Sequence, residues 1–319
     1  MGAKYRESEK LKAMKRIENQ KDLFSGDPGG GEYREIPRGF VLAEGEKNIY
    51  EPIRNEVLQY FKENKISWWG GKKPTGHVLS SQIACLNHLY PIRDDKEAVL
   101  KLVKKISRDF VDVLPIESDG IYKGYIQFEA VSSGDYLNEG AGNRGSNCTS
   151  IDALMHAVHQ DGSRWLIPIE WKYTEHYGNE NKGLTGCKGN PDKCSGKTRR
   201  DRYDDLIANS RQLKNQNHEV YYHEPFYQLM RQTLWSEQMI KHKEIDADKY
   251  LHVHVVPREN KALLDKKYKC SGLDMVSTWE NQLHDKAKYL MCSPEELLAD
   301  VDAEKHGPLL DYLRKRYWS

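Results

Sequence analysis

The sequence predicts an α/β protein with a mixed central β-sheet flanked by helices and an N-terminal helical addition. Apolar and polar residues alternate from 121 to 131, and again on both sides of a DGS turn, which predicts three strands. LHVHVVP, at 251–257, predicts a further strand. Apolar residues at helical spacing predict the surrounding helices. These segments are 3–22, 48–65, 80–90, 95–110, 201–216, 223–242, 274–284, 293–301 and 305–316.

The order of the elements indicates one main domain. We predict an N-terminal arm at 1–46 and a single domain at 47–319, whose core is at about 95–260 and which has helical additions at both ends. Ser80 or Ser81 can cap the third helix, and Pro91 ends it.

The composition indicates a soluble protein. Of 319 residues, 38% are hydrophobic and 30% are charged, and no apolar run approaches the roughly 18 residues of a membrane span. The N-terminus has no apolar central stretch, so we expect no secretory signal and a cytoplasmic location. Net charge is only +1, so binding to nucleic acid would need a local basic patch rather than an overall excess.

The six cysteines form no CxxC pair. Cys187 and Cys194, with His176 nearby, are the one zinc candidate, but structural zinc sites usually have two closely spaced ligand pairs. We expect reduced thiols instead.

Glu-x-Lys triplets occur four times, starting at Glu63, Glu170, Glu180 and Glu259. In so charged a chain the triplet alone means little. Only Glu170 lies inside an apolar strand, WLIPIEWKY. Residues two apart on a strand face the same side, so Glu170 and Lys172 point together. The apolar residues that face the other way are Trp165, Ile167, Ile169 and Trp171.

Asp152, on the neighbouring strand, is the expected partner of this pair. We place it opposite a residue just beyond Lys172, from where it reaches Glu170 as a diagonal neighbour. Two carboxylates at one end of a sheet suit Mg²⁺, with Mn²⁺ as a substitute. The metal would lower the pKa of a bound water, and Lys172 would position or activate that water for in-line attack on a phosphodiester. The alternative is a Glu170–Lys172 salt bridge with Asp152 as a turn or cap residue.

Four segments resemble the PD-(D/E)XK nuclease superfamily, and within it a bacterial group of predicted restriction endonucleases. They are HVLSSQIACLNHLYP, GSNCTSIDALMHAV, IPIEWKYTE and EPFYQLMRQTLWSEQM, in a region of roughly residues 75 to 260. The resemblance implies a restriction-endonuclease-like core and a magnesium-dependent enzyme that cuts DNA. Asp152 and Glu170 match the metal-binding acids, and Lys172 matches the catalytic lysine.

Two residues depart from that pattern. Ile151 stands before Asp152 where the superfamily's name has proline. Pro168 lies within the Glu170 strand, where it removes a ladder hydrogen bond, so it fits only beside a bulge or an unpaired side.

Further acids and polar residues are secondary candidates. Glu129 or Glu139 can supply an additional acid, and Glu175 is a weaker candidate; each is otherwise structural or solvated. One face of a helix can contact a phosphate or water, and a basic run can contact DNA, although both also fit ordinary polar surfaces. The helix face has Gln228, Arg231 and Gln232, and the basic run has Lys197, Arg199, Arg200 and Arg202.

Trp68 and Trp69 can stack on a base or serve as core or turn residues.

The function we predict is a DNA endonuclease of restriction or defence type, with magnesium as cofactor, DNA as partner and a homodimer as a plausible assembly. Alternatives are a nuclease for RNA or repair intermediates, and a nucleic-acid-binding protein that keeps the fold without catalysis. A small-molecule phosphate hydrolase is disfavoured because the sequence has no P-loop.

Overall fold

A computed structural model describes residues 4–118, 121–140, 148–187 and 194–319 of the chain. The α-helices are α1 (Lys4–Asn19), α2 (Arg54–Glu63), α3 (Ser81–Leu89), α4 (Lys96–Ile106), α5 (Ser195–Ala208), α6 (Phe226–His242), α7 (Lys261–Leu264), α8 (Met275–Asn281), α9 (Pro294–Leu298) and α10 (Ala303–Arg316). The strands are β1 (Glu32–Tyr33), β2 (Ile36–Pro37), β3 (Phe110–Leu114), β4 (Glu117–Ser118), β5 (Ile121–Tyr122), β6 (Ile126–Ala130), β7 (Ile151–His159), β8 (Arg164–Trp171), β9 (Lys249–Tyr250), β10 (His252–Val255) and β11 (Tyr289–Cys292).

The central sheet is mixed and has the order β11-β10-β8-β7-β3, with β6 also paired to β7 and β9 to β8. β7 runs antiparallel to β3, β6 and β8, whereas β8 runs parallel to β9 and β10. The predicted mixed α/β architecture is therefore confirmed. The β7–β8 hairpin is central because each of its strands pairs on both sides.

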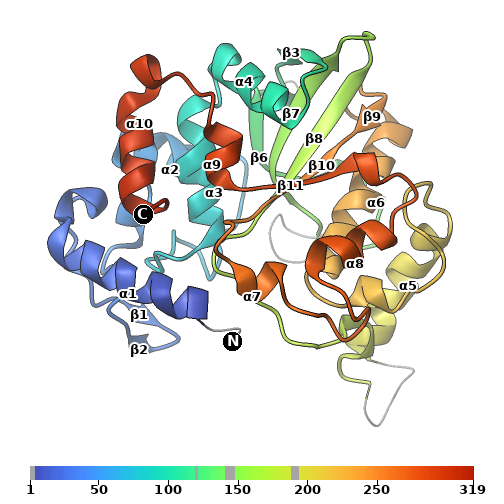
Figure 1. Cartoon of the computed structure of the whole chain (residues 1–319), viewed down its shortest axis with the longest axis horizontal. Helices are drawn as coiled ribbons and strands as arrows, with labels where there is room; N and C mark the ends of the chain where they lie inside the picture. The colour runs from blue at the N-terminus through green and yellow to red at the C-terminus, as the bar shows by residue number, and fades with distance from the viewer. Residues whose placement is uncertain (1–3, 119–120, 141–147, 188–193) are drawn as a thin grey trace.

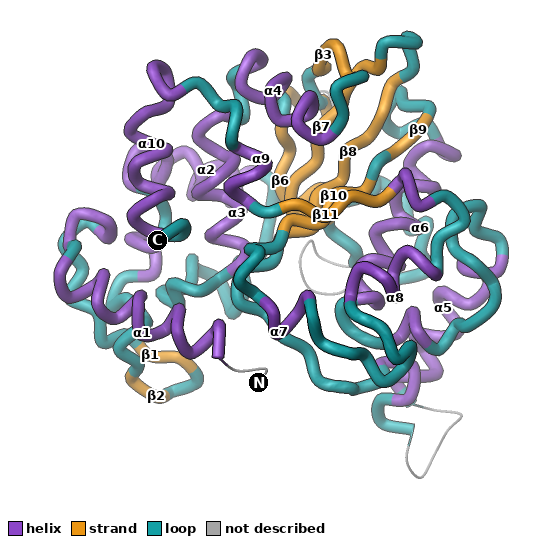
Figure 2. Tube along the Cα trace, viewed as in Figure 1, coloured by secondary structure: helices purple, strands orange, loops and turns teal. Residues whose placement is uncertain are grey.

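Helices cover both faces of the sheet (Figures 1 and 2). α2, α3, α4, α9 and α10 lie on one side, and α5, α6 and α8 on the other. Two hydrophobic cores correspond to these layers. Ile167, Ile169 and Trp171 of β8 lie in the first core, whereas Leu166 lies in the second. The predicted alternation of β8 is confirmed, since Glu170 and Lys172 face the α6 side.

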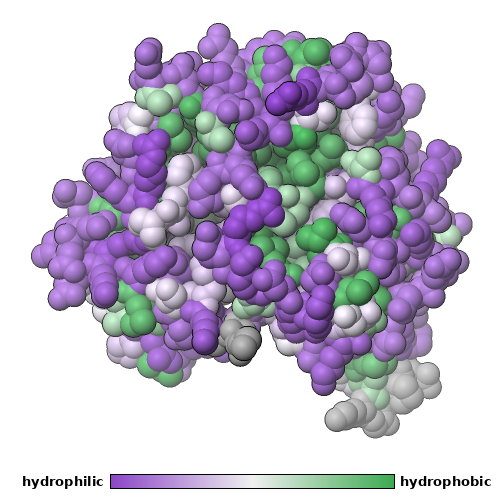
Figure 3. Space-filling view, in the orientation of Figure 1, coloured by the Kyte–Doolittle hydropathy of each residue, from purple (hydrophilic) through white to green (hydrophobic). Residues whose placement is uncertain are grey.

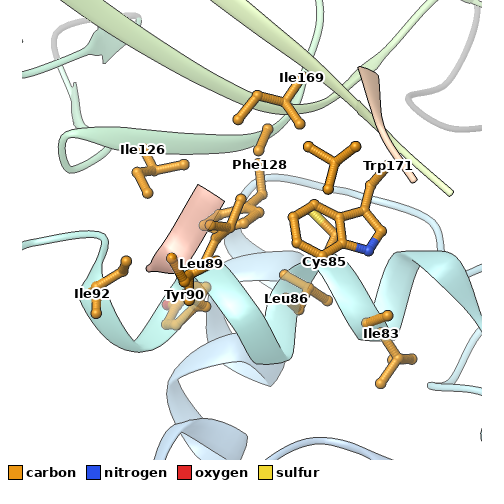
Figure 4. Close-up of a cluster of buried hydrophobic side chains, with 14 of the residues drawn as sticks. Ile83, Cys85, Leu86, Leu89, Tyr90, Ile92, Ile126, Phe128, Ile169 and Trp171 are labelled. Carbon is orange, nitrogen blue, oxygen red and sulfur yellow. The ribbon is translucent and has the colours of Figure 1, made fainter. Parts of the chain in front are cut away.

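Helix α3 packs directly on the sheet and anchors the end of β8 (Figure 4). Its Ser80 cap accepts a hydrogen bond from the Ile83 N–H at 3.4 Å, as the sequence predicted. Leu86 and Leu89 are fully buried in the first core, near Phe128 of β6. In Figure 4 the Trp171 ring lies against the same helix, so the packing holds the strand end on which the candidate site is built.

Residues of the predicted N-terminal arm take part in the first core. Ala13 and Ile17 of α1 and the following Phe24 are buried there. Arg16 donates through Nη2 to the main-chain oxygen of Ser319 at 2.9 Å. The start of the chain therefore lies beside its end, with α1 close to the C-terminus (Figure 1).

Several element boundaries differ from the prediction. The strand predicted at 121–131 is split into β5 and β6, and the helix predicted at 201–216 is α5, which begins at Ser195 and ends at Ala208. Strands β3 and β11 were not predicted. Their apolar segments are short and pair with distant partners, β7 and β10, which a local pattern cannot show.

Pro168 fits the sheet where the pairing of β8 on its parallel side is interrupted. β8 pairs with β9 at Trp165 and Leu166 and with β10 from Ile169 onwards. Among the described residues, the intervening positions pair with no strand on that side, so the missing N–H of Pro168 costs no ladder bond there. The expectation of an unpaired side at Pro168 is confirmed.

The expectation of reduced thiols is wrong for one pair. Cys187 and Cys194 form a disulfide. The Cys194 sulfur also accepts a hydrogen bond from the Lys197 N–H and so caps the start of α5. The sequence interval between them has no CxxC signature, so spacing alone gave no sign of the bond. Cys85, Cys270 and Cys292 form no disulfide among the described residues.

The face of the molecule in Figure 3 is mostly hydrophilic, with scattered apolar residues. This agrees with the charged composition. Among the described residues, no helix is long and apolar enough to cross a membrane.

The packing of α3 gives a stability prediction. We expect Leu89→Ala to lower the free energy of unfolding by about 3 kcal/mol, because it removes buried surface and leaves a cavity between α3 and the sheet. Leu184→Ala is the matched control, since Leu184 is 57% exposed, and a change within about 0.5 kcal/mol is expected there. Urea denaturation measures the free energy of unfolding of both variants. An equal loss of stability in the two would contradict this account of the core.

Candidate active site

Three acidic residues come from adjacent strands at one end of the sheet. The register pairs Phe128 with Ala153 and Ala153 with Ile169. One step further along each strand come Glu129 of β6, Asp152 of β7 and Glu170 of β8. The sheet therefore aligns these acids in one row, which we call the acid row.

The register corrects one detail of the sequence analysis. We predicted that Asp152 would lie opposite a residue beyond Lys172, and the prediction was wrong because the hairpin turn is centred on Asp161. Asp152 instead lies level with Glu170. Its Oδ2 accepts the Trp171 N–H at 2.7 Å, which holds the carboxylate beside the end of β8.

Glu129 is the least regular member of the acid row. Its φ of 48° lies in the left-handed region, which side-chain-bearing residues seldom adopt. Its Oε1 accepts from Gln82 Nε2 at 2.7 Å, and its Oε2 accepts from the Ser150 hydroxyl at 2.9 Å. An unfavourable backbone geometry held by two side-chain bonds is typical of a functional position.

Glu170 and Lys172 are both buried, at 2% and 6% exposure, and form an ion pair through Oε1 and Nζ. Lys172 Nζ also donates to Gln228 Oε1 at 2.6 Å. Burial opposes the charged ammonium, but the surrounding acids, led by Glu170, outweigh it and raise the pKa of Lys172 well above its usual range. The lysine is therefore a fixed positive charge.

Negative charge accumulates in the acid row. Burial raises the pKa of Asp152 well above its usual range, and the charge of Glu170 raises it further against the opposing effect of Lys172. Burial also raises the pKa of Glu129, and Glu170 adds to this, while bonds from Gln82 and Ser150 oppose it. These acids repel one another, so an added cation would stabilise them.

Three glutamines hold the acids without adding charge. Each donates its amide N–H to one acid and accepts a hydrogen bond through its amide oxygen. Gln82 bonds Glu129, Gln232 bonds Glu170 Oε2, and Gln228 bonds Glu224 Oε2 at 2.9 Å.

His252 fixes the direction of the Gln232 amide. Because a carboxylate only accepts, the Gln232 nitrogen must face Glu170 and its oxygen must face His252. Burial lowers the pKa of His252 to about 3, so the ring is neutral, and its Nε2 donates to Gln232 Oε1 at 2.7 Å. The sequence analysis did not assign this role to His252.

Two members of the acid row, Asp152 and Glu170, open into a pocket of about 390 Å³, whereas Glu129 does not line it. Asp152 and Glu170 line it from the sheet, and Gln228, Arg231 and Gln232 line it from α6. The further lining residues are Cys148, Thr149, Ser150, Arg199, Arg202, Tyr203, Glu224 and Tyr227. The predicted catalytic acids and the predicted α6 face therefore meet at one polar cavity.

A family model described as a restriction endonuclease associating with ARP matches residues 3–318. The chain belongs to this family. No curated protein and no solved structure matches it. The matched residues include the acid row and the α6 face.

Glu224 is an acid of this family member's site that the sequence analysis missed. It precedes α6 and lines the pocket. Burial raises its pKa, while the charge of Lys172 and the bond from Gln228 oppose the shift. The only local signal was its position four residues before Gln228, which brings it onto the same side of the helix start.

Glu139 does not line the pocket, because it is enclosed by three residues that do. It accepts from Arg231 Nη2 at 3.0 Å, from the Thr149 hydroxyl at 2.6 Å and from the Tyr203 hydroxyl at 2.6 Å. Arg231 is thereby tied to Glu139 rather than to the acid row. Of the two additional acids that we considered, Glu129 is the one that the sheet aligns with Asp152 and Glu170.

The whole predicted basic run lies on helix α5, but only two of its four residues line the pocket. Arg199 and Arg202 line the pocket, and Arg199 also donates to the Lys182 main-chain oxygen at 3.1 Å. Lys197 instead pairs with Asp201 at 2.6 Å, and Arg200 does not line the pocket. The two arginines three residues apart therefore share the face toward the acids.

Three other candidates lie elsewhere. Trp68 is buried and stacks on Phe61 with ring centroids 3.8 Å apart, so it is a core residue. Glu175 accepts the Tyr173 N–H at 2.7 Å and lines a different pocket, as does Trp69.

The residues present fit a hard divalent cation. Within the described ranges, no group of three or more His, Cys, Asp or Glu side chains is gathered closely enough to form a complete metal cage. Mg²⁺, however, commonly uses only one or two carboxylates and completes its shell with water and substrate phosphate. The mutual repulsion of Asp152 and Glu170 is the feature that a cation would relieve.

This repulsion gives a test in the absence of metal. We expect Asp152→Asn to raise the free energy of unfolding in chelator by about 1 kcal/mol or more near pH 8. The folded-state pKa of Asp152 is raised, so the folded wild type loses stability as pH rises above the ordinary aspartate pKa, and the variant does not. The difference should therefore grow with pH.

The matched control is Asp265→Asn, since that side chain is 63% exposed. Thermal or urea unfolding from pH 4 to pH 8 measures the effect, and an Asp152→Asn variant that is less stable at high pH would contradict the electrostatic account.

Proposed function

We propose that this chain is a divalent-metal-dependent phosphodiesterase of the PD-(D/E)XK kind that cuts DNA. The observation that carries the proposal is the acid row beside the buried ion pair of Glu170 and Lys172, with Asp152 and Glu170 lining a polar pocket. Several acids face one fixed lysine there, so the site keeps an excess of negative charge for a cation. Membership of a restriction-endonuclease-associated family supports DNA as the substrate.

Asp152 and Glu170 would hold Mg²⁺ or Mn²⁺, and Glu129 is the further acid nearest to them in the sheet. When bound, the metal would polarise the scissile phosphate and lower the pKa of a water. Gln232 keeps Glu170 in place, and the Trp171 N–H keeps Asp152 in place. The residues of this chain thus preorganise the oxygen ligands before substrate arrives.

Lys172 acts as a charge rather than as a base. Its raised pKa keeps Nζ protonated, so it can donate to the attacking water or to a phosphate oxygen but cannot accept a proton. Gln228, which lines the pocket, accepts one of its N–H groups and so holds the ammonium behind the pocket wall. As charge develops on the phosphate during in-line attack, the fixed ammonium would stabilise it.

Arg199 and Arg202 fit the phosphates that flank the scissile bond. Both line the pocket from α5, opposite the acids of the sheet. Because a duplex has two strands, two copies of the site in a homodimer would be needed to cut both at once.

Cleavage is the direct test. We expect the purified chain to cut plasmid or single-stranded DNA with Mg²⁺ or Mn²⁺ and not with chelator. Asp152→Ala should abolish cutting, and Lys172→Ala should slow it by roughly 10²- to 10⁴-fold, the usual contribution of such a group. Gel analysis of product over time measures both rates.

Asp265→Ala and Lys261→Ala are the matched controls, since this exposed acid–lysine pair lies outside the pocket. DNA binding without cutting by any metal would support the catalytically inactive binding protein instead. Cutting of RNA alone would keep the phosphodiesterase and replace its substrate.

The basic residues give an independent prediction. We expect Arg199→Ala and Arg202→Ala each to weaken DNA binding and to reduce the slope of log affinity against log salt by about 1, as for one lost phosphate contact. Lys197→Ala is the control, because Lys197 is paired with Asp201 and should change the slope less. Fluorescence anisotropy across a salt series measures the DNA affinity of each variant. Equal slopes in all three variants would show that α5 does not contact the DNA.

A further inference from the structure

A second pocket, of about 330 Å³, lies beside the residues that follow Lys172. Its wall includes Arg6, Tyr33, Trp69, His77 and Tyr177. These residues come from the N-terminal third of the chain and from the segment after β8, and the proposed function does not use them.

Three aromatic rings form one part of this pocket. Tyr33 and Trp69 lie nearly parallel, with centroids 5.9 Å apart and planes at 19°. The His77 ring stands edge-on to both, at 4.9 Å from Tyr33 and 5.9 Å from Trp69. Trp69 is 46% exposed, so part of its side chain is accessible to a ligand. Such rings bind nucleobases by stacking.

His77 presents a hydrogen-bond donor that has no acceptor. The residue is only 3% exposed, and its Nδ1 accepts the Leu79 N–H at 3.3 Å. Burial, together with the charge of Arg6, lowers the pKa of His77 to about 4, so the ring is neutral and its proton is on Nε2. Nε2 is buried without a hydrogen-bond partner among the described residues, which is costly unless a ligand supplies one.

Charged residues flank the rings. Arg6 lines the pocket, and its buried Nε also has no partner in the part of the chain that the structure describes. The Arg34 guanidinium lies 5.3 Å from the centre of the Tyr33 ring. Glu175 is the acid of the wall, and it accepts the Tyr173 N–H. Two guanidinium groups beside aromatic faces suit a phosphate attached to a base.

Two hydrogen-bonded paths connect this pocket to the acid row. The Trp69 N–H donates to Gln82 Oε1 at 2.9 Å, and Gln82 donates to Glu129. On the other side, Gln228 donates to the Tyr177 hydroxyl at 3.4 Å and accepts from Lys172. A strand at the acid row would therefore have this pocket as its neighbour.

We propose that this pocket binds one nucleotide extruded from the substrate duplex, its base against Trp69 and Tyr33, an acceptor atom on His77 Nε2 and its phosphate near Arg6 and Arg34. The proposal rests on the proposed function, which brings a DNA strand to the acid row. Extrusion costs unstacking energy, which is repaid by stacking on aromatic side chains and by hydrogen bonds to the base. A free mononucleotide has the same chemistry, and the experiment separates the two sources.

The test measures binding without cleavage. The full chain is titrated in chelator against a labelled duplex with 2-aminopurine at successive positions, and separately against deoxymononucleotides. We expect Trp69→Leu and His77→Gln to weaken duplex binding by roughly ten-fold or more, and to abolish the change in 2-aminopurine fluorescence that extrusion produces. Tyr122→Leu is the matched control, an exposed aromatic outside both pockets, and circular dichroism checks that each variant is folded.

Each outcome has a distinct meaning. Equal duplex affinity and fluorescence in wild type and both variants would overturn the pocket, while metal-dependent cutting lost in Asp152→Ala would leave the proposed function standing. Trp69-dependent binding of mononucleotides alone would overturn the extruded base as the source. Trp69-dependent duplex binding by a chain that cuts nothing would support the pocket and overturn the nuclease.

Discussion

The confinement of several acids at one end of a buried sheet is the constraint on which the site depends. Glu129, Asp152 and Glu170 are brought level by the pairing of three strands, so their charges cannot move apart without breaking the sheet. Among the described residues, Lys172 is the one basic side chain that forms an ion pair with a member of the row, and its partner is Glu170. Burying like charges is unfavourable in isolation, and a protein keeps such an arrangement where a ligand relieves it.

The strand β8 connects this polar end to the hydrophobic cores. Its period of two sends Ile169 and Trp171 into the first core and leaves Glu170 and Lys172 on the α6 face. The packing of Trp171 on α3 therefore fixes the directions of both neighbours. An acid and a lysine on a loop would lose their geometry to side-chain entropy, whereas here the core restrains them.

Local sequence patterns predicted much of the fold and the centre of the site. The β7–β8 hairpin, the caps of α3 and the pairing of Glu170 with Lys172 all follow from signals within a few residues. The short segments FVDVL and YLMC became strands β3 and β11 only because β7 and β10 lay beside them, which no local pattern contains. In the same way, Gln82 bonds Glu129 directly, whereas Glu224 and His252 contact the site through Gln228 and Gln232. These residues come from separate elements, so their roles required the fold. The Cys187–Cys194 bond likewise depended on where α5 begins.

The use of glutamine around the acids is consistent with a site that keeps its negative charge. An arginine or lysine in place of Gln82 or Gln232 would bond Glu129 or Glu170 equally well, but it would also neutralise the acid. Glu139 illustrates the alternative, because Arg231 pairs with it and leaves it no role as a free ligand.

A glutamine both donates and accepts, so it can join an acid to a second group without adding charge. Gln82 thereby connects Glu129 to the backbone of Trp69, and Gln228 connects Lys172 to Tyr177. A movement of Trp69 on binding would change the position of Glu129 through one amide, and a movement of Tyr177 would change the position of Lys172 in the same way. Recognition in the second pocket would thereby be coupled to the geometry of the acids.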